Sequence, residues 1–164
     1  MLIVSLDTSS QVLSVAVLSG ERIAAEVSMQ GALTHSETLM PHIELALQMA
    51  HAKKTELDGI AVSIGPGSFT GLRIGLAAAK MMAYALNIPM ICVPTLEALA
   101  CHYAGSVGLR ILPMMDAQKG NVYVQEFRWR PEGEGVRLSE EHPLSILPLT
   151  EVLDALAGTE LPAV

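Results

Sequence analysis

A Gly-rich stretch in the first half of the chain is the first candidate for chemistry. It covers residues 64–75 and combines four glycines with Ser68, Thr70 and Arg73. An apolar run precedes it and a long Ala- and Met-rich segment follows, so the expected order is strand, turn, helix. Glycines permit a turn with positive φ, and free N–H groups at a helix start can hold an anion. An anion-binding turn, such as a nucleotide phosphate loop, is therefore the first hypothesis.

The glycine spacing does not fit the two common phosphate-binding motifs. A P-loop has four residues between its glycines and continues with Gly-Lys-Ser/Thr. Here Gly67 and Gly71 enclose three residues, and Leu72 and Arg73 follow. A dinucleotide fingerprint would require glycine at Thr70. We therefore interpret the stretch as a structural loop, in which Arg73 forms a surface or interface ion pair. The residues of this loop are Gly65, Pro66, Gly67, Ser68, Thr70 and Arg73.

Small residues continue at every fourth position after this loop. Gly71, Gly75, Ala79 and Ala83 would share one face of a helix. Glycine inside a helix is up to about 1 kcal/mol less favourable than alanine, so the pattern calls for a compensating contact. Close approach of a second backbone is such a contact. That backbone belongs either to the sheet of this chain or to another chain.

A second candidate lies near the N-terminus, where Asp7 ends an apolar strand and Thr8 and Ser9 follow. A carboxylate beside hydroxyl groups can bind magnesium through water and place a phosphate near the hydroxyls, which makes these three residues a weak cofactor-binding candidate. The same side chains readily bond neighbouring N–H groups in an ordinary turn. We favour the turn and expect no cofactor. Asp116 repeats the pattern later in the chain.

The remaining reactive side chains lack the spacing of a catalytic or metal site. His35 and His42 lie seven positions apart without a His-Glu-x-x-His motif. Ser68 has no nearby His and Asp to activate it. Cys92 and Cys101 lack metal-ligand spacing and are expected to be buried, reduced thiols. We therefore predict no catalytic residue and no metal.

Composition narrows the class of protein. Apolar residues make up 51% and charged residues 16% of the 164 residues, and the formal net charge is −7. Such a negative charge argues against nucleic-acid binding by this chain alone. A short chain with so many apolar residues is expected to bury part of its surface against a partner. The N-terminus lacks the features of a signal peptide, and polar residues and a proline break the apolar region 74–93. We expect a cytoplasmic protein without a membrane segment.

The expected elements form two related lobes. Strands are predicted over residues 2–7, 12–18, 23–28, 57–64 and 90–93, and helices from Thr34 or Ser36 to 52, over 69–86, and over 96–103 after a Thr95 cap. This βββαβαβα lobe spans residues 1–105. The pattern then restarts over residues 106–164, with strands 109–115 and 122–129 and a helix 149–156 capped by Thr150. We interpret 106–164 as a partial second lobe.

Four motifs together resemble the TsaB (YeaZ-type) family. These are Leu6–Ser9, Thr34–Glu37, Gly65–Gly75 and Asp116–Tyr123, and the resemblance covers the chain to about Phe127. The family belongs to the glycoprotease-like branch of the actin, hexokinase and Hsp70 ATPase fold. The resemblance therefore implies an α/β, actin-like (ribonuclease H-like) fold with an incomplete or shortened second lobe.

The resemblance also implies a function and a set of partners. It implies a non-catalytic scaffold or activator subunit in tRNA threonylcarbamoyladenosine biosynthesis, which dimerises with the catalytic paralogue TsaD through its first two helices and works with the ATPase TsaE. A homodimer is expected when TsaD is absent, and tRNA would be met only indirectly. The expected interface residues are His35, Leu39, Gly71, Gly75, Ala79, Met82 and Ala83.

Two enzymatic alternatives remain beside this hypothesis. A nucleotide-dependent phosphotransferase of the same fold would hold magnesium-ATP between Asp7 and Asp116, but it needs an adenosine-binding loop that this chain lacks. A metallopeptidase-like hydrolase would use the His-x-x-x-His motif of the catalytic paralogue. Thr95 and Leu99 occupy those two positions here, so the imidazole pair is missing.

Overall fold

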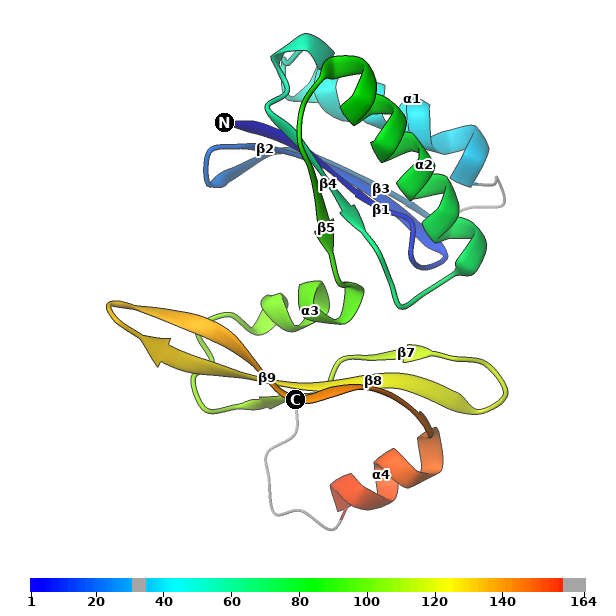
Figure 1. Ribbon diagram of the computed structural model, residues 1–164, viewed down its shortest axis with the longest axis vertical. Helices are drawn as coiled ribbons and strands as arrows, with labels where there is room; N and C mark the ends of the chain where they lie inside the picture. Colours follow the sequence, from blue (N-terminus) through cyan, green and yellow to red (C-terminus); the bar gives the residue numbers. More distant parts are fainter. Residues whose placement is uncertain (31–34, 158–164) are drawn as a thin grey trace. The chain divides into compact units, whose positions relative to one another are not determined.

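The computed structural model describes residues 1–30 and 35–157. It consists of two compact units, Met1–Pro94 and Thr95–Val164, and Figure 1 traces the elements of each. The boundary lies before the predicted one at residue 105, because the short helix α3 (Thr95–Ala100) packs on the sheet of the second unit. Within the described residues, no helix is long and apolar enough to cross a membrane.

The first unit is built on a five-stranded mixed sheet. Its strands are β1 (Leu2–Asp7), β2 (Val12–Ser19), β3 (Arg22–Gln30), β4 (Gly59–Ser63) and β5 (Met90–Val93). Their order is β3-β2-β1-β4-β5, with antiparallel pairing among the first three strands and parallel pairing of β4 with β1 and of β5 with β4. All five strands fall where the sequence predicts them.

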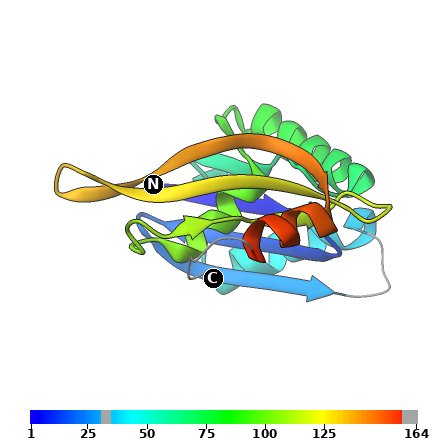
Figure 2. The ribbon, with the colours of Figure 1, turned by 90° about the horizontal axis from the view of Figure 1, so that it is seen from below.

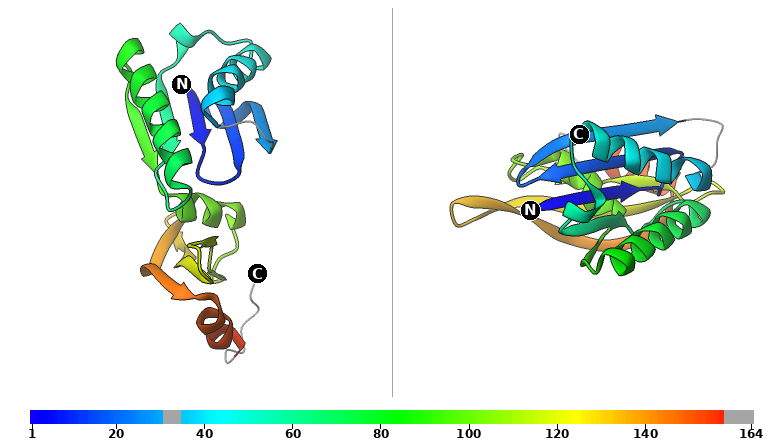
Figure 3. Two further views of the ribbon diagram at one scale, coloured as in Figure 1. Left: turned by 90° about the vertical axis from the view of Figure 1, so that its right-hand side faces the viewer. Right: turned by 90° about the horizontal axis from the view of Figure 1, so that it is seen from above.

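Two long helices cover one face of this sheet, as both views in Figure 3 show. They are α1 (His35–Met49) and α2 (Phe69–Leu86), and the short 3₁₀ turn η1 (Lys54–Glu56) follows α1. Alternate strand residues such as Leu6 and Val15 face the helices and form one core with Ile43 of α1. The predicted Thr34 cap lies outside the described residues.

Helix α2 has the predicted bounds because both of its ends carry local stop signals. The hydroxyl oxygen of Ser68 accepts a 3.2 Å hydrogen bond from the N–H of Gly71 and caps the start of the helix. Asn87 ends it in the left-handed conformation, with φ of 54°. The Ser68 cap therefore sets where the Gly-rich loop passes into the helix.

The second unit contains a four-stranded antiparallel sheet. Its strands are β6 (Arg110–Ile111), β7 (Met114–Asp116), β8 (Asn121–Glu132) and β9 (Gly135–Pro148). The long strand β8 pairs with β6 and β7 along one edge and with β9 along the other. Figure 2 shows β8 and β9, in yellow and orange, as one long ribbon. Helix α4 (Leu149–Ala157) follows β9.

The second unit departs from the sequence prediction in three places. Pro113 has no N–H to donate, and the predicted strand 109–115 is split there into β6 and β7. Strand β9 was not predicted, since it contains Pro143 and ends at Pro148; the edge of a sheet tolerates these prolines. Thr150 lies within α4 and does not cap it.

Two helices pack on opposite sides of this second sheet (Figure 1). Leu96 and Ala100 of α3 join Phe127 and Trp129 of β8 in a small apolar core. The end of the predicted helix 96–103 is a 3₁₀ turn, η2 (Cys101–Tyr103). On the other side of the sheet, Val152 of α4 is buried. Val124 of β8 is also buried, and it faces the side opposite to Phe127 and Trp129 because side chains alternate along a strand.

Candidate functional site

Hydrogen bonds from neighbouring elements meet at the turn after β1. Oδ1 of Asp7 accepts a 2.7 Å hydrogen bond from the Ser63 hydroxyl and a 2.9 Å hydrogen bond from the Ser9 N–H. The carboxylate thus joins the end of β1 to the end of β4 and holds its own turn closed. His35 at the start of α1 reaches the same turn, because its Nε2 lies 2.9 Å from the Ser10 carbonyl oxygen and donates to it.

Thr8 fits into a notch that the glycines of α2 leave open. Its hydroxyl donates a 2.8 Å hydrogen bond to the carbonyl oxygen of Gly71. A Cβ atom at Gly71 would overlap the carbonyl oxygen of Thr8, and one at Gly75 would overlap the Thr8 hydroxyl. The close backbone approach predicted from the glycine spacing is therefore real, and the approaching residue belongs to this chain.

The Gly-rich loop is tied to the same turn. The Ser68 N–H donates a 2.7 Å hydrogen bond to the carbonyl oxygen of Ser9. A Cβ atom at Gly67 would overlap that carbonyl group. Gly65 has φ of 104°, a conformation that side chains disfavour. These contacts use the N–H groups of Ser68 and Gly71 at the helix start, which an anion would need.

The weak cofactor-binding prediction does not fit these contacts. Thr8 and Ser9 are 0% and 2% exposed, and the Thr8 hydroxyl already donates to Gly71. Neither hydroxyl group faces outward to meet a phosphate. The bonding of the Asp7 carboxylate is that of a turn, the alternative that the sequence analysis favoured.

The predicted partner-interface residues lie inside the first unit. The fully or largely buried ones are Leu39, Gly71, Gly75, Ala79 and Met82. His35 and Ala83 are half-buried, with Ala83 packed against the core. The small-residue face of α2 points to its own sheet and turn, so these residues do not form an open docking surface. The two glycines meet Thr8, whereas Leu39, Ala79 and Met82 pack in the core of this unit.

The opposite side of α2 carries large exposed side chains. Phe69, Met81 and Tyr84 are 72%, 71% and 89% exposed. The Arg73 guanidinium lies 4.5 Å from the centre of the Phe69 ring, in a cation–π contact rather than the predicted ion pair. We call Phe69, Arg73, Ala77, Met81 and Tyr84 the α2 outer row, since their spacing places them on one helix face. The spacing of these large residues is visible in the sequence, but the prediction rested on the small-residue pattern of the same helix.

Helix α1 also exposes apolar side chains. Met40, Leu45 and Met49 are 41%, 44% and 53% exposed. Large exposed apolar groups that gather on neighbouring elements are typical of protein–protein contacts. The two helices therefore expose apolar surface on residues other than the predicted interface residues.

The second unit repeats the turn of the first unit. Oδ1 of Asp116 accepts a 2.7 Å hydrogen bond from the Gln118 N–H, as Oδ1 of Asp7 does from Ser9. Gln118 and Lys119 have φ of 67° and 55°, and both side chains are exposed. The internal repeat inferred from the sequence is thus present in the bonding of the two turns.

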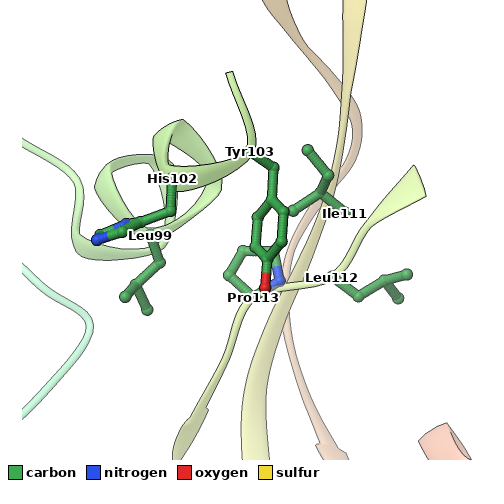
Figure 4. Close-up of a pocket in the computed structure, with 6 residues that line it drawn as sticks. All are labelled: Leu99, His102, Tyr103, Ile111, Leu112 and Pro113. Atoms are coloured by element: carbon green, nitrogen blue, oxygen red, sulfur yellow. The ribbon is translucent and has the colours of Figure 1, made fainter. Parts of the chain in front are cut away.

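The positions that correspond to a metal-binding histidine pair lie on α3. Thr95 is buried, and Leu99 lines a cavity of about 320 Å³. Figure 4 shows the single imidazole of that wall, His102, beside Leu99, with Tyr103, Ile111, Leu112 and Pro113 on the other side. In residues 1–30 and 35–157, no group of three His, Cys, Asp or Glu side chains is placed to hold a metal ion.

Both cysteines are exposed, so the prediction that they are buried is wrong. Cys92 lies on β5, which is an edge strand, and Cys101 begins the 3₁₀ turn η2. Partial burial raises the pKa of the Cys101 thiol, and the negative charge of Glu97 adds to the effect.

Comparison with known proteins gives concordant results. A family model described as TsaD, tRNA N6-adenosine threonylcarbamoyltransferase, matches residues 27–140. A tRNA threonylcarbamoyladenosine biosynthesis protein TsaB from Bacillus subtilis is 36% identical over 130 residues, which is 79% of this chain and 56% of the relative. The protein of that name from Escherichia coli is 31% identical over 129 residues, which is 78% of this chain and 55% of the relative.

A solved structure agrees with the sequence matches. YeaZ from Pseudomonas aeruginosa superposes with a TM-score of 0.77 at 29% identity and covers 90% of this chain and 67% of its own. The chain therefore spans roughly half the length of the two curated relatives named above.

Proposed function

Since the chain belongs to the tRNA N6-adenosine threonylcarbamoyltransferase family as a TsaB (YeaZ-type) member, we propose that it acts in tRNA threonylcarbamoyladenosine biosynthesis. Its fold is the expected actin-like, ribonuclease H-like α/β fold. The names of the Bacillus subtilis and Escherichia coli relatives support the proposed process.

The proposed role is that of a non-catalytic scaffold. The turn that would hold a nucleotide phosphate is closed by its own hydrogen bonds to Ser63 and Gly71. The positions for a histidine pair hold Thr95 and Leu99. These two observations support a subunit that assists the transfer over a phosphotransferase or a metallopeptidase-like hydrolase.

The α2 outer row carries the proposal about the partner. In this proposal Phe69, Met81 and Tyr84 dock on a TsaD-type paralogue, and the apolar side chains of α1 extend the contact. The ATPase TsaE would join that pair, and a homodimer would use the same row when TsaD is absent. Ten basic residues and a net charge of −7 favour indirect contact with tRNA, in the cytoplasm where tRNA is modified.

Light scattering after size exclusion tests the pairing directly. The chain is run alone and mixed with the TsaD-type paralogue of its organism. We expect a one-to-one complex, and we expect Met81→Glu and Tyr84→Glu each to weaken it by at least about tenfold, as loss of a central apolar anchor does. Ile146→Glu is the matched control, since Ile146 is 58% exposed on β9, in the second unit.

Circular dichroism of each variant should be measured to check that the fold is kept. If the outer-row variants bind as the unaltered chain does, the row is not the interface. If the unaltered chain forms no complex with the paralogue, the proposed pairing itself is wrong. Mass spectrometry of tRNA nucleosides tests the process independently: cells depleted of the protein should lose threonylcarbamoyladenosine, and the unaltered gene should restore it.

A further inference from the structure

The second unit contains a cavity that the proposed function does not use. It has a volume of about 460 Å³ and lies between α4 and the strands β6, β8 and β9. Aliphatic side chains such as Leu112, Val124 and Val152 form much of its lining. Polar and charged side chains form the rest of the lining, and a volume of this size lies within the range of small-molecule sites.

Glu126 is the unusual residue of this cavity. Val124 and Glu126 lie on the same face of β8, so the alternation of the strand would place an apolar side chain at position 126. Glu126 is nevertheless only 7% exposed. Its two carboxylate oxygens accept hydrogen bonds of 2.7 Å each from Nε and Nη2 of Arg110. A buried ion pair adds little net stability compared with apolar residues, so packing alone does not account for it.

Two irregularities in β9 bring a histidine to the same place. The register shifts on both sides of Glu126, which is paired with His142. Such bulges re-aim side chains and are frequent beside binding sites. Nε2 of His142 lies 3.8 Å from Oε2 of Glu126, and the imidazole is 75% exposed. The histidine therefore stands at the edge of the cavity beside the carboxylate.

The charges of the lining favour a cation. Glu126 and Glu151 contribute two carboxylates, whereas Arg110 directs Nε and Nη2 to Glu126. This hydrogen bonding raises the pKa of Arg110. Each carboxylate oxygen has a second lone pair, so Glu126 can accept a further donor. An anion would face both carboxylates, and the Nε and Nη2 groups of Arg110 are already bonded to Glu126; His142 is the other basic side chain of the lining.

We propose that this cavity binds a small organic amine, with its ammonium group on Glu126 and Glu151 and its apolar part on Leu112, Val124 and Val152. The site lies wholly in the second unit and is independent of the proposed docking of α2. The proposal gives the buried Glu126 carboxylate of β8 a role as a ligand-binding group.

Two-dimensional ¹⁵N–¹H spectra of the whole chain test the proposal with three probes of equal length. Hexylamine, which is an ammonium ion at neutral pH, should shift the amides that line the cavity and saturate. Hexanoate and hexanol should bind at least about tenfold more weakly, because they lack the charge that the two carboxylates attract. Equal binding of the three probes, or shifts scattered outside the cavity, would overturn the proposal.

Variants distinguish the site from a general surface effect. Glu151→Gln should weaken hexylamine binding about threefold, the effect of losing one exposed ion pair, while Glu134→Gln in the β8–β9 turn should not. Ala155→Phe fills the cavity from α4 and should abolish binding, whereas Ala157→Phe, outside the lining, should leave it unchanged. Unchanged binding in both Glu151→Gln and Ala155→Phe contradicts the assigned site.

Discussion

The Thr8 hydroxyl donates a 2.8 Å hydrogen bond to the carbonyl oxygen of Gly71, which ties the turn after β1 to the first turn of α2. This contact explains why glycine recurs on the helix. It also changes how an interface can be tested. A large side chain at Gly75 would displace Thr8 and unfold the first unit, so a loss of assembly in Gly75→Leu would not identify a docking surface.

Gly75→Ala should lower the free energy of unfolding by about 1–3 kcal/mol, because the added Cβ overlaps the Thr8 hydroxyl. The loss is expected even though alanine favours a helix over glycine by about 1 kcal/mol. Urea unfolding followed by circular dichroism measures it. Gly135→Ala is the control, since the nearest atom to its Cβ would lie 3.8 Å away.

A second substitution at Thr8 distinguishes the two glycines. At Gly75 the new Cβ meets only side-chain atoms of Thr8, so Thr8→Ala should relieve part of the loss. At Gly71 it meets the Thr8 carbonyl oxygen, which Thr8→Ala leaves in place. Because only the Gly75 overlap is removed by Thr8→Ala, the relief measured in double-mutant cycles should be larger for Gly75 than for Gly71. Equal coupling at both positions would contradict this geometry.

Arg110→Met should destabilise the chain by about 3–5 kcal/mol, because it leaves the buried Glu126 carboxylate without its partner. The double variant Arg110→Met with Glu126→Leu should recover much of this loss. Chemical unfolding measures both. Arg137→Met is the control: its pair with Glu132 is 67% and 62% exposed, so at most about 1 kcal/mol is expected.

Glu141 should titrate below the ordinary range of a glutamate. The pKa of Glu141 is lowered chiefly because Arg130 donates hydrogen bonds to it. Since the folded-state pKa is the lower one, this stabilisation is present above the ordinary carboxyl pKa and is lost as the pH falls through the folded-state value. In a carboxyl-detected NMR titration, Arg130→Gln should raise the pKa of Glu141. Arg137→Gln should leave it unchanged.

Cys101 should alkylate slowly for an exposed thiol. Its pKa is raised by partial burial and by the charge of Glu97, so less thiolate is present at pH 8. Iodoacetamide labelling followed by mass spectrometry should show faster reaction in Glu97→Gln. If the rate is the same with and without Glu97, its charge does not govern this thiol. The raised pKa also means that the associated stability is present below the ordinary thiol pKa and declines as the pH rises through the folded-state value.

The first unit could be predicted closely because its signals are local. Helix α2 begins at the Ser68 cap and ends at Asn87, and both residues act within one turn of the chain. Strand β9 was missed for the same reason, since Pro143 and Pro148 are local signals against a strand. Only its pairing along one edge of β8, which is a tertiary contact, makes the prolines acceptable.

The candidate site was predicted in part. The glycine spacing indicated a close approach, but Thr8 and Gly71 lie 63 positions apart, and no local pattern joins them. The sequence therefore could not decide whether the approaching backbone came from the same chain. Once the contact of Thr8 with Gly71 is known, the glycine face of α2 is the inward face. The α2 outer row must then be the exposed face of the helix.

The position of β1 in its sheet has a consequence for synthesis. β1 lies between β2 and β4, so the ribosome releases a hairpin whose inner strand lacks a partner along one edge until Gly59–Ser63 emerges. An unpaired apolar edge is a template for association with other chains. Nascent chains that stall before β4 should therefore recruit chaperones, and those that stall after α2 should not.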